Sequence, residues 1–175
     1  PSGSGKSTLG KILAQNLNIP FVDLDEEIET RGGVAIPEIF ASQGEASFRA
    51  KERQTLSVIL KPKEQVIALG GGALTTPECR NLAEASGQII LLNASTDTLL
   101  ARLQADTVVR PLLAGDAREN LSRLLAKREA HYASFPIKVD TSAKTPQDIA
   151  WEIQVLLGMF HVCGMATRQN PGYDV

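Results

Sequence analysis

The stretch Gly3-Ser4-Gly5-Lys6-Ser7-Thr8 decides the fold, and a helical period from Lys6 to Leu17 follows it directly. It ends the pattern G-x-x-x-x-G-K-[ST], whose first glycine would immediately precede Pro1. Glycines let the backbone amides turn toward phosphate oxygens, Lys6 reaches the outer phosphates and the Ser7 hydroxyl ligates Mg²⁺. The alternative is a Gly/Ser-rich turn that caps an ordinary helix, but the contiguous Gly-Lys-Ser-Thr favours a nucleoside triphosphate site.

Short apolar runs alternate with helical periods along the rest of the chain. The runs are bounded by Pro, Gly, Asn or Asp, as buried strands are, and the longer segments carry apolar residues at helical spacing. This alternation predicts an α/β fold with a parallel sheet covered by helices on both faces. We expect strands at 21–22, 66–69, 89–92 and 137–139, and helices at 6–17, 45–60, 96–103, 118–132 and 146–157.

Composition narrows the class of protein. The 175 residues include 18 Lys plus Arg and 20 Asp plus Glu, and 43% are hydrophobic, which suits one well-buried domain. The near-neutral charge and the lack of a basic run argue against a nucleic-acid partner. No apolar run approaches the roughly 18 residues of a membrane span, so we expect no membrane contact. Only two cysteines occur, which predicts a cytoplasmic protein without a disulfide framework.

Two carboxylates follow the second apolar run, at Asp23 and Asp25. Open parallel sheets bind ligands at the carboxyl ends of their strands, and alternation points both side chains to the same side. A metal-linked Asp23 and a hydroxyl-facing Asp25 suit phosphoryl transfer, in which orientation and charge neutralisation dominate. The alternative is that Asp25 only caps the helix at 26–30.

Two further features suit an acidic acceptor. Arg49 and Glu52 lie three residues apart on one helix face, so Glu52 can hold the guanidinium as a fork for a carboxylate; an exposed salt bridge is the alternative. The run Gly70-Gly71-Gly72 directly follows a predicted strand. It lets a ligand rest against bare backbone, although a flexible turn would also explain it.

Two more arginines are candidates for the phosphate and substrate sites. Arg110 lies in a segment, 109–115, whose Pro and Gly suggest the limits of a flap that closes on phosphates. Arg128 lies in a basic helix and either faces the site or belongs to a solvated helix face. The guanine-reading pattern N-K-x-D does not occur, and the short chain favours a small-molecule kinase over a GTPase.

Taken together, these residues closely resemble the shikimate kinases, P-loop kinases of the adenylate-kinase-like type. The resemblance covers roughly residues 1–158 and implies a three-layer P-loop kinase fold. Its carriers are GSGKST at 3–8, DLD at 23–25, IFASQGEASFR at 39–49, GGGA at 70–73, RPLLAG at 110–115 and the segment 128–132.

The resemblance implies transfer of the ATP γ-phosphoryl group to the 3-hydroxyl of shikimate, in aromatic amino-acid biosynthesis. It assigns Lys6, Asp25 and Arg110 to catalysis, with Asp25 as candidate base and Arg110 as the lid arginine. Its remaining assignments are Gly3 to Thr8 with Arg102, Lys144 and Pro146 for ATP, Ser7 and Asp23 for Mg²⁺, and Asp25, Arg49, Gly70, Gly71, Gly72 and Arg128 for shikimate.

The resemblance also brings expectations about the two ends. The first strand of the fold, central in the sheet, would precede Pro1 and is missing from the sequence, and residues 159–175 form a tail or linker. The stretch 171–175 weakly resembles the opening of 3-dehydroquinate synthase, which suggests a fusion to that enzyme, and we expect the protein to be a monomer. Alternative functions are a gluconate-type P-loop kinase and a kinase-like sensor of aromatic acids.

Overall fold

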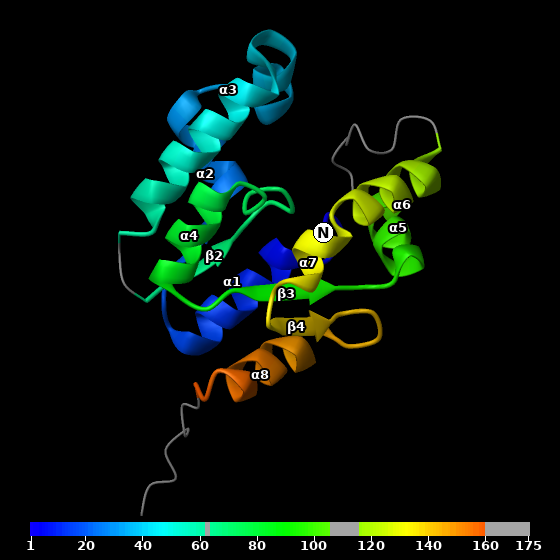
Figure 1. Ribbon diagram of the computed structural model, residues 1–175. Coiled ribbons are helices and arrows are strands. Elements are labelled where there is room, and N and C mark those ends of the chain that lie inside the picture. The colour runs from blue at the N-terminus through cyan, green and yellow to red at the C-terminus, as the bar shows by residue number, and fades with distance from the viewer. Residues whose placement is uncertain (62–63, 106–115, 160–175) are drawn as a thin grey trace, which may run out of the picture.

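The computed structural model describes residues 1–61, 64–105 and 116–159, which form a mixed helix and strand fold (Figure 1). Its elements, in chain order, are α1 (Lys6–Leu17), β1 (Phe21–Asp23), α2 (Leu24–Gly32), α3 (Ile36–Ile59), β2 (Val66–Ala68), α4 (Pro77–Ser86), β3 (Ile90–Asn93), α5 (Thr96–Ala105), α6 (Ala117–Lys127), α7 (Glu129–Ala133), β4 (Ile137–Asp140) and α8 (Pro146–Leu156). Each predicted strand is present.

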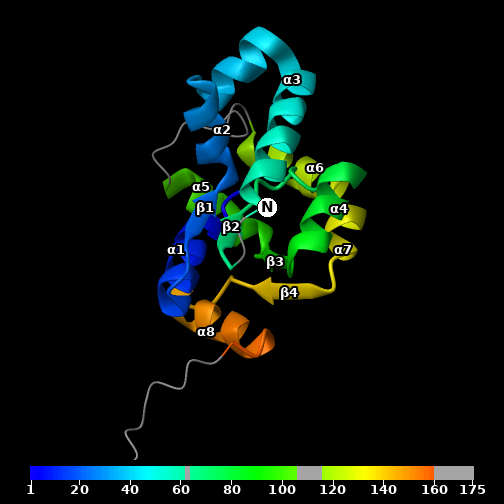
Figure 2. The ribbon, with the colours of Figure 1, turned by 90° about the vertical axis from the view of Figure 1, so that its left-hand side faces the viewer.

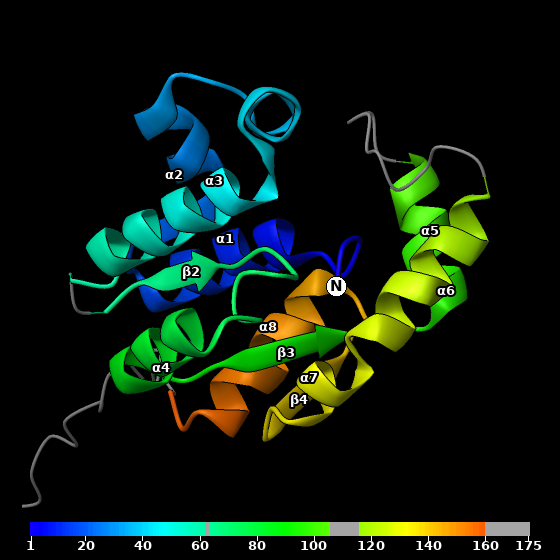
Figure 3. The same cartoon turned by 45° about the horizontal axis from the view of Figure 1, so that its top comes forward.

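The strands pair in parallel, as the alternation predicted. β1 pairs with β2, with Val22 opposite Ile67, and β3 pairs with β4, with Leu92 opposite Val139. Figure 3 shows β2 and β3 pointing the same way, but no strand ladder joins them in the described part of the chain. A central strand between these two pairs, upstream of Pro1, stays a prediction.

Helices cover both faces of the strands, which confirms the three-layer architecture (Figure 2). Successive residues on a strand point to opposite faces, and β3 shows this directly. Leu91 joins a core cluster with Phe48 and Leu56 of α3, whereas Leu92 packs with Leu13 of α1 and with α8. No helix among the described residues is long and apolar enough to cross a membrane.

The helix α3 begins earlier than the predicted start at residue 45. It runs from Ile36, and Gly44 interrupts it with φ 76° and ψ 173°, so the amphipathic period is broken there. The left-handed φ at this kink suits glycine. The helical pattern was therefore visible only beyond the kink.

Two other helices differ from prediction. The helix α4 was not predicted. Only two of its residues, Cys79 and Ala83, are buried, so its sequence shows little apolar periodicity. The predicted helix at 118–132 is broken into α6 and α7 at Arg128, whose φ of −108° and ψ of 5° leave the helical region. The short helix α7 therefore has its own direction.

Candidate active site

The predicted phosphate loop leads into α1. Gly3 and Gly5 have φ of 79° and 83°, a region that glycine adopts readily, and Gly5 is the N-cap of the helix. The Lys6 ammonium folds back to donate to the Pro1 carbonyl at 3.2 Å, and the buried Ser4 hydroxyl donates to the same oxygen at 2.8 Å. The loop thus places a cation and the amino end of a twelve-residue helix side by side, an arrangement that favours anions.

Ser7 and Asp23 meet beside this loop. The Ser7 hydroxyl donates to Asp23 Oδ2 at 2.6 Å, and Asp23 Oδ1 accepts the Asp25 amide at 3.0 Å as the N-cap of α2. The helix is therefore capped by Asp23, so the alternative that Asp25 serves as its cap is wrong. A hydroxyl and a carboxylate are hard oxygen ligands that suit Mg²⁺.

The described residues hold no cluster of three or more His, Cys, Asp or Glu side chains with metal-binding geometry. Proteins usually bind Mg²⁺ through one or two carboxylates together with substrate phosphates and water. The pair formed by Ser7 and Asp23 matches that sparse donor set.

Asp25 lies against the glycine run that follows β2. A Cβ atom at Gly70 would lie 3.2 Å from Asp25 Oδ1 and 3.5 Å from its Oδ2, so the carboxylate packs on bare backbone. The run itself is a turn, in which the Ala73 amide donates to the Gly70 carbonyl at 3.0 Å. The turn holds its backbone close to the Asp25 carboxylate.

Two arginines far apart in the sequence, Arg49 of α3 and Arg128 between α6 and α7, lie close to Gly72. A Cβ atom at this glycine would lie 3.0 Å from Arg128 Nη2 and 3.1 Å from Arg49 Nη2. Arg49 Nη1 donates to Glu52 at 2.7 Å, and its Nη2 donates to Glu45 at 3.2 Å. Two guanidinium groups that face one bare backbone position offer parallel N–H donors, a geometry that suits a carboxylate ligand.

Glu52 anchors the Arg49 guanidinium from within the protein. Its side chain is only 3% exposed, so the alternative of an exposed salt bridge does not describe this pair. Burial raises the pKa of Glu52 above its ordinary value, the hydrogen bond and charge of Arg49 oppose that rise, and the nearby Asp25 carboxylate adds to it. Glu52 therefore links the arginine pair electrostatically to Asp25.

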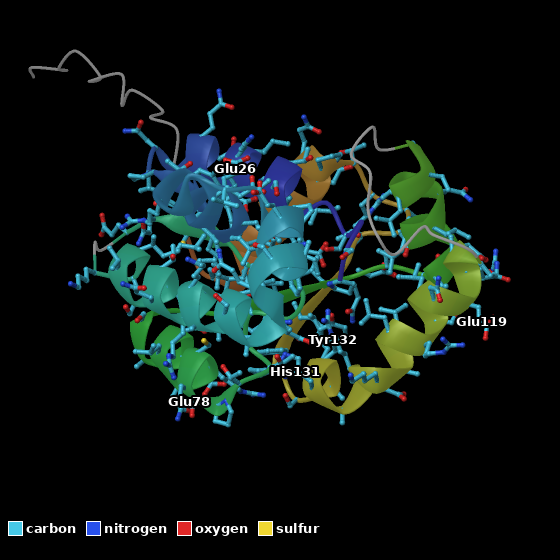
Figure 4. All side chains as sticks on the ribbon, turned by 90° about the horizontal axis from the view of Figure 1, so that it is seen from above. Glu26, Glu78, Glu119, His131 and Tyr132 are labelled. Atoms are coloured by element: carbon cyan, nitrogen blue, oxygen red, sulfur yellow. The ribbon has the colours of Figure 1, made fainter. Side chains whose placement is uncertain are left out.

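Tyr132 was not assigned a role from the sequence. Its hydroxyl donates to the Gly71 carbonyl at 2.9 Å, and a Cβ atom at Gly71 would lie 3.1 Å from that hydroxyl and 3.4 Å from Arg128 Nη1. Figure 4 shows Tyr132 toward the middle of the molecule, away from Glu119 at the outer part of α6. Its spacing of four residues from Arg128 was the signal that could have identified it, because such residues share a helix face.

The residues expected on the adenine side lie around the loop after β4. Arg102 donates from Nη1 to the Thr141 hydroxyl at 3.0 Å and from Nη2 to the Thr141 carbonyl at 2.6 Å. Lys144 pairs with Glu152 of α8 at 2.5 Å, and Pro146 is the first residue of that helix. Thr141 is a buried connector that the sequence did not single out.

The last of the predicted site residues, Arg110, falls in the segment 106–115, outside the described residues. The assignment of this residue to a lid therefore stays a prediction. The helices on either side of the segment, α5 and α6, pack against each other through Leu99, Leu103 and Leu121.

Comparison with known proteins assigns the chain to one family. A sequence profile described as Shikimate kinase matches residues 2–157. The chain belongs to the shikimate kinase family. A shikimate kinase of Chlorobium chlorochromatii is 44% identical over 152 residues, which are 82% of this chain and 80% of that protein. One from Francisella tularensis is 41% identical over 160 residues, 90% of each chain.

Solved structures of shikimate kinases agree with the fold. The enzyme from Acinetobacter baumannii in complex with shikimate gives a TM-score of 0.83 at 34% identity, over 90% of this chain and 89% of that one. The enzyme from Aquifex aeolicus gives 0.77 at 36% identity, over 89% and 91%. These matches confirm the α/β P-loop fold and the family expected from the sequence.

Proposed function

We propose that this chain transfers the γ-phosphoryl group of ATP to the 3-hydroxyl of shikimate and releases shikimate 3-phosphate and ADP. The observation that carries the proposal is the arginine pair, Arg49 and Arg128 beside Gly72, in the same glycine run on which the Asp25 carboxylate lies at Gly70. A cationic fork for a carboxylate beside an acceptor for a hydroxyl proton matches a hydroxy acid, and family membership names that acid.

The arginine pair binds the carboxylate of shikimate. Guanidinium groups bind carboxylates through parallel N–H···O bonds, which fix orientation as well as charge. The buried Glu52 carboxylate already holds the Arg49 guanidinium in place. The Arg49 side chain therefore loses little conformational freedom when the acid binds. The pair thereby sets which end of the ring faces away from the nucleotide.

Asp25 orients the acceptor hydroxyl and takes its proton. The carboxylate lies against Gly70, so a ligand that rests on the glycine run would lie beside it. Proton acceptance by a positioned carboxylate and alignment of the hydroxyl with the γ-phosphorus are the main protein contributions in such transfers.

The phosphate loop, Gly3 to Thr8, binds the phosphates of ATP, with Lys6 on their outer charge. Ser7 and Asp23 would hold Mg²⁺, which neutralises phosphate charge and orients the chain of phosphates. Arg102, Lys144 and Pro146 bind on the adenine side, and Arg110 closes over the transferring group. The cation of Arg110 would act where charge builds up during transfer.

We further infer a monomeric, cytoplasmic kinase domain that comprises residues 1–158. The family profile ends at residue 157 and α8 at Leu156, which supports this boundary. Fusion to 3-dehydroquinate synthase through residues 159–175 stays a prediction from the sequence.

ADP release measured with shikimate and with gluconate tests the proposed function. We expect turnover with shikimate only, a product phosphorylated at the 3-hydroxyl in ³¹P NMR, and no turnover by Lys6→Ala. Shikimate methyl ester should show a strongly raised KM with little change in kcat, because it lacks the charge that the arginine pair binds. Preference for gluconate, or equal KM for acid and ester, would contradict the proposal.

A further inference from the structure

Tyr132 forms a hydrogen bond that phosphoryl transfer itself does not require. Its hydroxyl donates to the Gly71 carbonyl at 2.9 Å and joins α7 to the turn after β2, two segments far apart in the sequence. Because the bond is partly buried, water competes for the hydroxyl and the carbonyl less than it would at the surface. It is a tertiary connection between the two halves of the predicted shikimate site.

The helix that carries Tyr132 is too short to position a side chain by itself. Helix α7 spans five residues, Glu129–Ala133, and the chain leaves helical geometry at Arg128 immediately before it. Isolated helices below about 12 residues are marginal in water, so the direction of α7 depends on tertiary contacts. Arg128, at the break, depends on the same contacts.

Arg128 and Tyr132 are coupled through one turn of backbone. The Tyr132 amide donates to the Arg128 carbonyl at 2.8 Å, and a spacing of four residues puts both side chains on one face. That face meets the glycine run, where the hydroxyl donates to the Gly71 carbonyl and the guanidinium lies beside Gly72, 3.0 Å from the position that a Cβ atom would take there. A shift of the helix would therefore move the guanidinium away from Arg49.

We propose that Tyr132 is a positioning residue for shikimate binding, which holds α7 on the Gly71 carbonyl so that Arg128 meets Arg49 over Gly72. The role of Tyr132 rests on the proposed function, since it acts through the carboxylate-binding pair. It makes no contact with the substrate in this assignment.

Ser134 provides a matched control at the other end of the same helix. Its hydroxyl accepts from Arg80 Nη1 at 2.6 Å and donates to the His131 carbonyl at 2.7 Å. The bond from Arg80 ties the end of α7 to α4, the bond to His131 stays at this end of α7, and neither reaches the glycine run. Ser134→Ala thus removes a hydroxyl of α7 without touching the connection made by Tyr132.

Steady-state kinetics of Tyr132→Phe, Ser134→Ala and Arg128→Met test the proposal. We expect Tyr132→Phe to raise the KM for shikimate about 3- to 10-fold, as loss of one net hydrogen bond allows, with the KM for ATP unchanged. Ser134→Ala should leave both values near wild type. In the Arg128→Met background, Tyr132→Phe should change kcat/KM for shikimate by less than about twofold, because the group it positions is gone.

Hydrogen exchange of the free protein gives a second readout that needs no substrate. Tyr132→Phe should speed amide exchange in α7 and in residues 70–73, and Ser134→Ala should leave residues 70–73 unchanged. An unchanged KM for shikimate in Tyr132→Phe, an equal cost in the Arg128→Met background, or unchanged exchange at 70–73 would overturn the proposal. Absence of shikimate turnover in the wild type would refute the proposed function instead, and the exchange experiment would still decide whether Tyr132 holds the glycine run.

Discussion

A methyl group at position 72 would meet both guanidinium groups of the pocket. In Gly72→Ala the new Cβ would lie 3.0 Å from Arg128 Nη2, 3.1 Å from Arg49 Nη2 and 3.3 Å from Arg49 Nη1. Ordinary contact begins at 3.4 Å, so the two Nη2 atoms must withdraw by about 0.4 and 0.3 Å. The methyl group also occupies the place toward which both groups point.

The cost should appear in substrate binding and not in folding. Gly72 does not have a left-handed φ, so alanine can adopt its backbone conformation, and the atoms it meets are the mobile ends of long side chains. The free energy of unfolding should change by less than about 1 kcal/mol. Loss of one charge-assisted hydrogen bond, about 1.5–3 kcal/mol, corresponds to a KM for shikimate raised roughly 10- to 100-fold.

Initial rates at saturating ATP, with shikimate varied, measure this effect, and urea unfolding measures stability. Gly32→Ala is the matched control, because a Cβ at this helical glycine meets nothing within 4 Å. The control should retain the wild-type KM. An unchanged KM for shikimate in Gly72→Ala would refute the placement of the arginine pair, and a large loss of stability would show that the turn, not the pocket, was damaged.

Three further substitutions test the site. Asp25→Asn should lower kcat about 100-fold or more with the KM for ATP retained, because the amide can hold a hydroxyl but cannot take its proton; near-normal kcat would remove Asp25 as base. Arg49→Lys should raise the KM for shikimate about 10-fold, since a point charge loses the planar fork, and an unchanged KM would exclude Arg49 from the pocket. Glu52 has a raised pKa in the folded protein, so its contribution to stability is present below its ordinary value of 4.5 and is lost as pH rises through the raised pKa. Urea unfolding from about pH 4 to about pH 7 should show this loss in the wild type and not in Glu52→Gln; parallel profiles would contradict it.

Much of the fold could be predicted because each strand is a short, mostly apolar run that ends at Gly, Asn or Asp. Leu91 and Leu92 are buried on opposite faces, so their strand reads as a continuous apolar run in the sequence. The helix α4 could not be seen in the same way, since few of its residues are buried. The break at Arg128 was invisible because periodicity reports which face is apolar and not where the backbone bends.

The sequence suggested candidate site residues but few of the contacts among them. Sequence spacing placed Arg49 beside Glu52, and the structure has that ion pair at 2.7 Å. It could not show that Arg128 meets Arg49 over Gly72, because that contact depends on tertiary packing of two helices. The same limit hid Tyr132, whose partner is a backbone carbonyl that carries no side-chain signature.

The two oxygens of Asp23 have different tasks, one toward the Ser7 hydroxyl and one toward the first turn of α2. In the proposed Mg²⁺ site, a substitution of Asp23 that changes the cation ligand would also replace the residue that caps α2. A longer glutamate would withdraw the cap, which is worth about 1 kcal/mol to a helix, and would move the backbone that carries Asp25. An asparagine would keep the cap and lose the charge. In the proposed site, Mg²⁺ binding and the placement of Asp25 therefore both depend on the side chain of Asp23.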